Sequence, residues 1–286
     1  MTGPPGNGGW VCATCGNHYP ARPAPPASCV ICADERQWVP PSGQRWTTMA
    51  DLATDGRRCD IWEEEPGLLG VGVNPPVGIG QRGLIVVTPE GNLLWDPPGF
   101  VDEGAIDRVR EAGGLRAVTA SHPHFYGAMA EWSHAFGADI LVPEADASWV
   151  TAPDPAIRTW ASREAVLPGV TLVQCGGHFP GSAVVHWAGG AGGAGVLLTG
   201  DTIFVTPGED RITFVWSAPN RLPLPEAAVR GIVGAVRPFP FDRIYGGWAP
   251  TIRQDARRVL ENSADRYIQL LRGDAMHPAH QRNINI

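Results

Sequence analysis

The sequence predicts a mixed α/β domain that follows a small cysteine-rich module, and three observations support this fold class. Four cysteines lie close together near the start of the chain. From residue 46 onward, apolar runs of strand length alternate with segments of helical spacing. Several of those runs end in histidine or aspartate, which places polar side chains at a rigid sheet edge. With 286 residues and 43% apolar content, the chain can bury one large core and one small one.

The module is expected at residues 1–45 and is defined by two Cys-x2-Cys turns. Each turn points both sulfurs to one side, so two turns can surround one metal ion with four thiolates. No feature of the chain indicates export, so metal binding is favoured over disulfides. Structural zinc is the favoured occupant, and an electron-transfer iron is the alternative, because both metals accept four thiolates. The segment resembles short rubredoxin-like or zinc-ribbon knuckles, and its expected ligands are Cys12, Cys15, Cys29 and Cys32.

The large domain, expected at residues 46–286, begins with strands. Runs rich in Val, Ile and Leu predict them, and the Pro-Glu-Gly-Asn segment at 89–92 is typical of a hairpin turn. A helix is expected at 102–112, where Ile106 and Val109 have helical spacing and two glycines follow. The strands expected in this half are 68–73, 83–88 and 92–96.

The second half of the domain continues the alternation. The Gly- and Ala-rich stretch 188–195 is expected to connect two strands into a hairpin. Apolar spacing predicts helices at 127–136, 225–236 and 252–271. The strands expected here are 139–142, 170–174, 184–187 and 196–199.

Three motifs supply metal-ligating side chains at the ends of strands. The apolar run 115–120 is followed by Ser-His-Pro-His, which aims His122 and His124 at one point. A Gly-His-Phe-Pro-Gly-Ser segment contributes His178, and the run Leu-Leu-Thr-Gly ends in Asp201. Three imidazoles and one carboxylate make a four-ligand set for zinc, and iron is the alternative. Asp201 acts either as the fourth ligand, which is favoured, or as a base beside the metal.

These three motifs resemble the successive metal motifs of the metallo-β-lactamase superfamily. The resemblance covers roughly residues 46–286 and implies an αββα sandwich with the metal cleft at one edge of two packed sheets. It also implies a supporting role for Asp96, which ends the run Leu-Leu-Trp-Asp and would stand behind the ligands.

The departures from the family pattern all concern its second metal site. The family's first motif continues His-x-His-x-Asp-His, whereas this chain has Tyr126 and Gly127 at the last two positions. The family's last strand is followed by a histidine, whereas the stretch 243–248 ends in Trp248. The resemblance therefore implies one metal ion in the cleft.

Several side chains near these motifs have more than one interpretation. Tyr126 could ligate, donate a hydrogen bond to a substrate oxyanion, or fill the vacated volume, and filling is favoured. Trp248 and Trp216 are candidates for the wall of the substrate pocket, although a core role for Trp216 is equally plausible. Glu131 is expected to face solvent, and Cys175 is expected to be a buried small apolar residue rather than a catalytic thiol.

The leading hypothesis for function is a mononuclear metal-dependent hydrolase of a small ester, thioester or lactone, with zinc in the cleft. The substrate class comes from the family resemblance. One alternative is an iron oxygenase similar to the superfamily's persulfide dioxygenases. The other is a non-catalytic binding protein in which the metal is structural.

Composition limits the partners. The net charge is −7, with 29 acidic and 22 basic residues, and every basic residue is arginine. An acidic chain without a basic stripe is not expected to bind nucleic acid, and no apolar run predicts a membrane span. The first residues show neither a charged nor an apolar signal region, so we expect a cytoplasmic protein with a small-molecule substrate. The sequence does not predict an oligomeric state.

Overall fold

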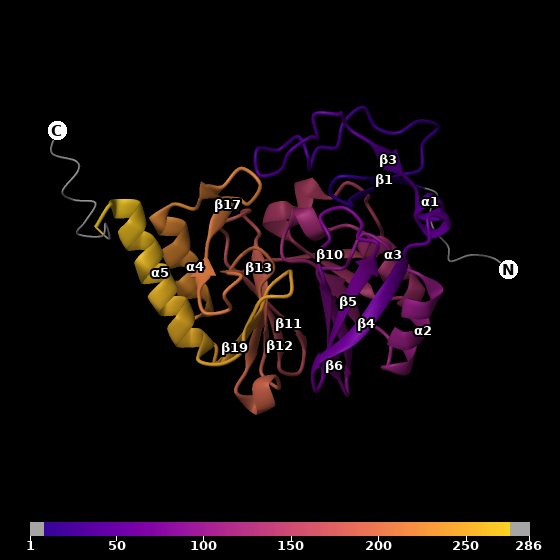
Figure 1. The fold of residues 1–286 in the computed structure, drawn as a ribbon. Helices are drawn as coiled ribbons and strands as arrows, with labels where there is room; N and C mark the ends of the chain where they lie inside the picture. Colours follow the sequence, from indigo (N-terminus) through magenta and orange to yellow (C-terminus); the bar gives the residue numbers. More distant parts are fainter. Residues whose placement is uncertain (1–8, 275–286) are drawn as a thin grey trace, which may run out of the picture.

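Two β-sheets packed face to face, with helices on both outer faces, form the main body of the protein (Figure 1). The computed structural model describes residues 9–274. The first sheet has seven strands in the order β10-β9-β8-β7-β6-β5-β4, and the second has six in the order β11-β12-β13-β14-β19-β20. The arrangement is an αββα sandwich, which confirms the predicted fold class.

The first sheet combines an antiparallel meander with a parallel half. Strands β4 to β7 are joined by hairpins, whereas β7, β8, β9 and β10 run parallel to one another. Parallel neighbours end at the same edge, so whatever follows β7 and β8 is brought together there. The strands are β4 (Arg58–Glu65), β5 (Leu68–Asn74), β6 (Gly83–Thr88), β7 (Gly91–Trp95), β8 (Ala117–Thr119), β9 (Asp139–Pro143) and β10 (Ile157–Trp160).

The second sheet is antiparallel except for one pair of strands, β14 and β19, which run parallel. The expected hairpin around 188–195 is present, since β13 pairs antiparallel with β14. The strands are β11 (Arg163–Leu167), β12 (Val170–Gln174), β13 (Ala183–Trp187), β14 (Val196–Leu198), β19 (Arg243–Tyr245) and β20 (Thr251–Ile252).

Side-chain alternation along the strands divides the core into three layers. Leu93 and Leu198 lie in the apolar cluster between the two sheets, whereas their neighbours Leu94 and Leu197 face the helices. The period of two in a strand sends successive side chains to opposite faces, so both faces of each sheet are apolar. Helices α2 (Glu103–Glu111) and α3 (Met129–Phe136) cover the first sheet, and α4 (Glu226–Val236) and α5 (Ala256–Arg272) cover the second.

The cysteine-rich module lies across one edge of the sandwich, where the indigo segment of Figure 1 arches over it. It contains a small sheet of β1 (Trp10–Cys12), β2 (His18–Tyr19) and β3 (Trp46–Thr47), followed by α1 (Met49–Thr54). Because β3 pairs with β1, the small sheet extends past the boundary placed at residue 45. The shorter elements are η1 (Pro123–Phe125), η2 (Glu144–Trp149), β15 (Phe204–Val205), β16 (Ile212–Thr213), β17 (Val215–Ser217) and β18 (Leu222–Pro223), together with η3 (Ala191–Gly193), which lies at the opposite edge, in the turn between β13 and β14.

The outermost strands of both sheets are the elements that sequence reasoning does not find. Strands β4, β10 and β11 are not among the expected ones, and β20 lies where the sequence predicts the start of a helix that begins only at Ala256. Edge strands carry more polar side chains and are often short, which weakens their apolar signal. Within residues 9–274, no helix has the length and apolar character needed to cross a bilayer.

Candidate metal centre

Four side chains from three separate loops converge at one edge of the sandwich. His122 and His124 follow β8, His178 lies between β12 and β13, and Asp201 follows β14. Their ligating atoms all lie within 4.8 Å of one another. His178 Nε2 is 3.3 Å from His124 Nδ1, and Asp201 Oδ2 is 3.7 Å from His122 Nε2. The sequence motifs therefore meet in space as one cluster.

The chemistry of the cluster fits a divalent first-row metal ion. His122 Nε2 and Asp201 Oδ1 are buried and have no hydrogen-bond partner among residues 9–274. Buried polar atoms without partners are costly, unless a bound ion satisfies them. Burial lowers the pKa of the His178 imidazole to about 4, and it lowers the pKa values of His122 and His124 well below their usual range. All three rings are therefore neutral at pH 7, which is the form that binds metal.

The unliganded side of two of the rings is fixed by a neighbour. Ser121 Oγ lies 2.8 Å from His122 Nδ1, and His178 Nδ1 lies 3.1 Å from the carbonyl oxygen of Val215. A hydrogen bond at Nδ1 leaves Nε2 free to ligate and holds the ring plane in place. Burial raises the pKa of Asp201 to about 7, and a bound cation would favour its ionised form.

Asp96 stands directly behind the cluster, as the family resemblance implied. Its Oδ1 accepts a hydrogen bond of 2.6 Å from the backbone N–H of Ser121. The turn before Asp201 passes so close that a Cβ on Gly200 would lie 2.1 Å from Ser121 Oγ and 2.9 Å from Asp96 Oδ2. Gly200 also has a φ of +49°, so glycine is required there for both reasons.

Tyr126 and Gly127 are turned away from the cluster. The Tyr126 ring packs in the apolar cluster between α3 and the first sheet, and its hydroxyl has no partner within residues 9–274. Burial, with a contribution from the charge of Asp146, raises the pKa of this phenol well above its ordinary value. A Cβ on Gly127 would point at the carbonyl oxygens of Pro97 and Gly16, at 3.4 and 3.6 Å. The space next to Gly127 is occupied by the cysteine-rich module.

The two tryptophans have different surroundings. Trp248 packs edge-on against Phe125, and it lies 5.5 Å from the Phe204 ring. Trp248 and Phe204 line an apolar cavity of about 220 Å³ that also reaches Gly200, next to Asp201. Trp216 instead donates its indole N–H to Glu35 at 2.9 Å, so it belongs to the contact between the module and the sandwich.

The module forms a second candidate metal site of four cysteines. The four Sγ atoms lie within 4.8 Å of one another, and the sulfurs of Cys12 and Cys32 are 3.6 Å apart, with no disulfide among the described cysteines. Side-chain donors point at the sulfurs, as expected for thiolates. Gln44 donates to Cys12 at 3.0 Å, and the Tyr19 hydroxyl donates to Cys29 at 3.2 Å.

Sequence reasoning missed the residues that join the two sites. Arg36 donates to the carbonyl oxygen of His178, and Asn17 donates to that of His124. Glu131 was expected to face solvent, which is wrong, because it forms a 2.8 Å ion pair with His18 of the module. Neither Asn17 nor Arg36 belongs to a recognisable motif, so only the folded arrangement reveals them.

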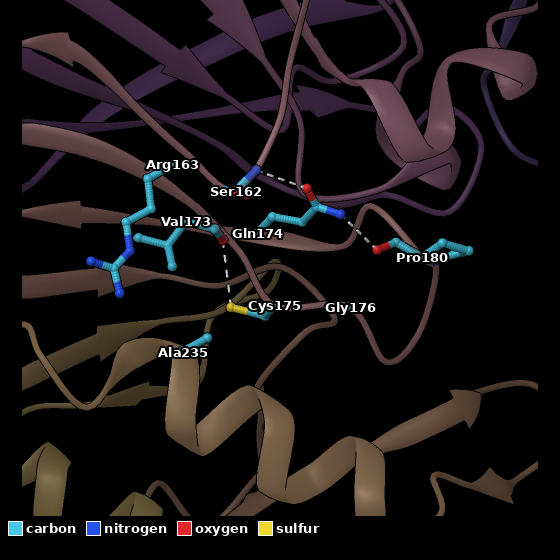
Figure 2. A pocket seen from close by; sticks show the side chains of 8 residues that line it. All are labelled: Ser162, Arg163, Val173, Gln174, Cys175, Gly176, Pro180 and Ala235. Atoms are coloured by element: carbon cyan, nitrogen blue, oxygen red, sulfur yellow. Dashed lines mark hydrogen bonds between the residues drawn. The ribbon is translucent and has the colours of Figure 1, made fainter.

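A larger cavity of about 540 Å³ opens behind the loop that carries His178 (Figure 2). Figure 2 shows Gln174 tied to Ser162 and Pro180, with the Cys175 sulfur pointing to the carbonyl of Val173. Burial raises the pKa of the Cys175 thiol to about 12, so it is not a nucleophile at neutral pH. None of the four cleft ligands lines this cavity.

Comparison with known proteins agrees with this geometry. Residues 78–280 match the family model described as metallo-beta-lactamase superfamily. The chain is 38% identical over 270 residues to the uncharacterized protein YmaE of Bacillus subtilis (strain 168), covering 94% of this chain and 98% of that protein. Among solved structures, DIM-1 metallo-beta-lactamase exposed to ceftazidime superposes with a TM-score of 0.55 at 12% identity, covering 73% and 95% of the two chains. VMB-1 superposes with a TM-score of 0.56 at 10% identity, covering 75% and 98%.

Proposed function

We propose, from the premise that this chain belongs to the metallo-β-lactamase superfamily, that it is a hydrolase with a single metal ion in the cleft. The observation that supports a single ion is the ligand set. His122, His124, His178 and Asp201 converge, whereas the positions of a second site carry Tyr126, Gly127 and Trp248. Zinc is the proposed metal, since neutral imidazoles and a carboxylate suit it and zinc needs no redox partner.

The residues present can support hydrolysis. When bound, the metal ion supplies a water of lowered pKa and polarises a carbonyl oxygen. Asp201 directs Oδ2 toward the histidine nitrogens, at 3.7 and 3.9 Å. Its other oxygen, Oδ1, is buried without a partner in the described residues, which supports a bound ion beside this carboxylate. The Tyr126 hydroxyl has no hydrogen-bond partner among residues 9–274 and its ring packs under α3, so the proposal gives it no role at an oxyanion.

A small ester, thioester or lactone is the proposed substrate class. The apolar cavity of about 220 Å³ beside Gly200 fits a short acyl chain or a single ring rather than a polymer. Its aromatic walls are Phe204 and Trp248, so the proposal favours apolar over charged acyl groups. The net charge of −7 also supports a small-molecule substrate over a nucleic acid.

A substrate panel tests this proposal. The metal-loaded protein is assayed on nitrophenyl esters, thioesters and lactones of increasing acyl length, alongside chelator-treated protein and His122→Ala. Turnover that requires metal and declines for long or charged acyl groups is expected. Failure to hydrolyse any member of the panel with full cleft occupancy would contradict the hydrolase proposal.

Burial of the ligands favours a second candidate, a binding protein whose cleft metal is structural. The ligands are 0 to 4% exposed, and closed metal sites are more typical of structural than of catalytic roles. Full metal occupancy together with an inactive substrate panel is the result expected for this candidate. An iron oxygenase would instead purify with iron in the cleft, and metal analysis separates it from the zinc hydrolase.

A further inference from the structure

We propose that the four-cysteine module positions the cleft ligands, with Asn17 holding His124 and Arg36 holding His178. The metal state of the module then sets the metal affinity of the cleft. The proposal concerns metal binding and does not depend on which reaction the cleft performs. Four sets of contacts support it.

Asn17 connects the two sites through one side chain. Its Nδ2 lies 3.5 Å from Cys15 Sγ, and it also lies 3.3 and 3.2 Å from the carbonyl oxygens of Pro123 and His124. The residue is fully buried. An amide with donors toward both a cysteine sulfur and the backbone of a ligand couples their positions, because moving one loses a hydrogen bond to the other.

The turn that carries Asn17 fits against the sandwich without space for side chains. A Cβ on Gly78 would lie 2.5 Å from the backbone carbon of Cys15, and one on Gly99 would lie 3.0 Å from the carbonyl oxygen of Gly16. Gly127 faces the same turn, at a position where the family has a second-site ligand. The module therefore fills the space that Gly127 faces, where the family has a ligand side chain.

Arg36 makes the corresponding contact with the other ligand loop. Its guanidinium lies over the Phe179 ring, 3.7 Å from the centroid, and 4.8 Å from that of Trp216. Nη1 donates to the carbonyl oxygen of His178 at 3.2 Å, and Asp34 binds the opposite side of the guanidinium in a bidentate pair. A planar group stacked and bonded on both edges has one orientation, which lysine cannot reproduce.

A buried ion pair fastens the module to the helix behind the cleft. His18 Nδ1 lies 2.8 Å from Glu131 on α3, and its Nε2 lies 3.1 Å from the carbonyl oxygen of Gly99. The backbone carbonyl of His18 accepts a further hydrogen bond from Thr151. These contacts hold the module in one orientation on the sandwich. On this proposal, a displacement of the cysteine turn therefore moves the backbone of the ligand loops.

Asn17→Ala is the primary test, with Asn92→Ala as the matched control. Asn92 is also fully buried and donates to two backbone carbonyls, those of Ala112 and Gly114, far from either metal site. We expect Asn17→Ala to retain the metal of the module and to bind cobalt(II) in the cleft at least about tenfold more weakly than wild type. The cleft signal is read from the cobalt spectrum, since nitrogen and oxygen ligation differs from thiolate ligation. Asn92→Ala is expected to keep wild-type cleft affinity.

Substitution of Arg36 distinguishes a charge effect from a positioning role, because the two change the metal affinity of the cleft in opposite directions. If Arg36 acted only through its charge, Arg36→Ala would tighten cation binding in the cleft, because a positive neighbour repels the metal. A positioning role predicts weaker binding for both Arg36→Ala and Arg36→Lys, of about tenfold. Arg257, which stacks on Phe241 away from the cleft, supplies the control Arg257→Ala.

Removal of the module's own metal completes the experiment. Cys32→Ser is expected to lower cleft affinity by at least the same factor as Asn17→Ala. Wild-type cleft affinity in Asn17→Ala, or tighter binding in Arg36→Ala, would overturn the proposal even if Cys32→Ser failed to fold.

Discussion

At the residue scale, the cleft histidines are prepared for metal before any metal binds. Each of His122 and His178 has its Nδ1 engaged by a neighbour and its Nε2 directed into the cluster. Their environment lowers the cost of binding in two ways: the rings are already neutral, and their rotamers are already fixed. We therefore expect substitution of one cleft histidine to weaken metal binding far more than substitution of a histidine elsewhere in the domain.

His122→Ala is expected to weaken cleft metal binding by about 100-fold or more and to leave the metal of the module in place. The control is His134→Ala, because His134 lies on α3, outside the cluster, and pairs with Asp154. Metal content after dialysis should fall by one ion per chain in the first variant and stay unchanged in the second. Loss of both ions from His122→Ala would mean that the two sites form a single folding unit.

Asp146 carries a testable dependence of stability on pH. It is fully buried and accepts a hydrogen bond from Gly181 N, but its Oδ2 has no partner among the described residues. Burial raises the pKa of this carboxyl to about 6. The folded state therefore binds more protons than the unfolded state between about pH 4 and pH 6, and stability falls as pH rises through that window.

Asp146→Asn removes the ionisation and keeps an acceptor for Gly181. We expect the variant and wild type to have equal free energies of unfolding near pH 4, with the variant more stable by roughly 2–3 kcal/mol above pH 7. Urea unfolding of metal-free protein at several pH values measures the difference. A constant difference across that range would show that the pKa of this carboxyl is the same in the folded and the unfolded protein.

At the element scale, the sandwich brings loops together by strand polarity. Strands β7 and β8 are parallel neighbours, so Asp96 and the His-x-His segment begin at the same edge. Strand β14 of the other sheet ends there as well and contributes Asp201. The close passage of these loops depends on Gly200, because the side chains of Ser121 and Asp96 occupy the space that a Cβ would need.

Gly200→Ala is expected to lower the free energy of unfolding by about 2–4 kcal/mol and to weaken cleft metal binding. The added methyl would displace Ser121, whose Oγ holds His122. Gly234→Ala on α4 is the control, because nothing lies within 4 Å of its Cβ and alanine favours a helix. The free energy of unfolding of the Gly234→Ala variant should rise by roughly 0.5–1 kcal/mol. Normal stability in Gly200→Ala would show that the loop relaxes easily.

At the scale of the whole molecule, the sequence predicts the fold and the four ligands of the cleft, but it does not predict how the cysteine-rich module packs against the ligand loops. His122 and His124 belong to one short motif, and buried strands are recognisable as short apolar runs in the sequence. The contacts of Asn17 with His124 and of Arg36 with His178 join residues 107 and 142 positions apart. No local pattern encodes such pairs. The edge strands were missed for a related reason, since β4, for example, is mostly charged and polar.

The protein is expected to bind two metal ions per chain, one at the four-cysteine cluster and one in the cleft. Elemental analysis of protein purified without added metal, normalised to amino-acid content, measures the ratio. A third ion, seen by its anomalous signal next to the cleft ion, would show that the cleft keeps a second metal site despite Tyr126 and Gly127.

The way the module lies over the sandwich also has a consequence during synthesis. The four cysteine ligands are all present once residue 32 has been synthesised. The cleft also needs Asp201, and the His178 ring forms a hydrogen bond with the carbonyl oxygen of Val215. The ribosome therefore delivers a chain able to take its first ion long before the second site exists. Arg36 can make its hydrogen bond to His178 and stack on Phe179 and Trp216 only after residue 216 has been synthesised. The order in which the two ligand sets become available is fixed by the direction of translation.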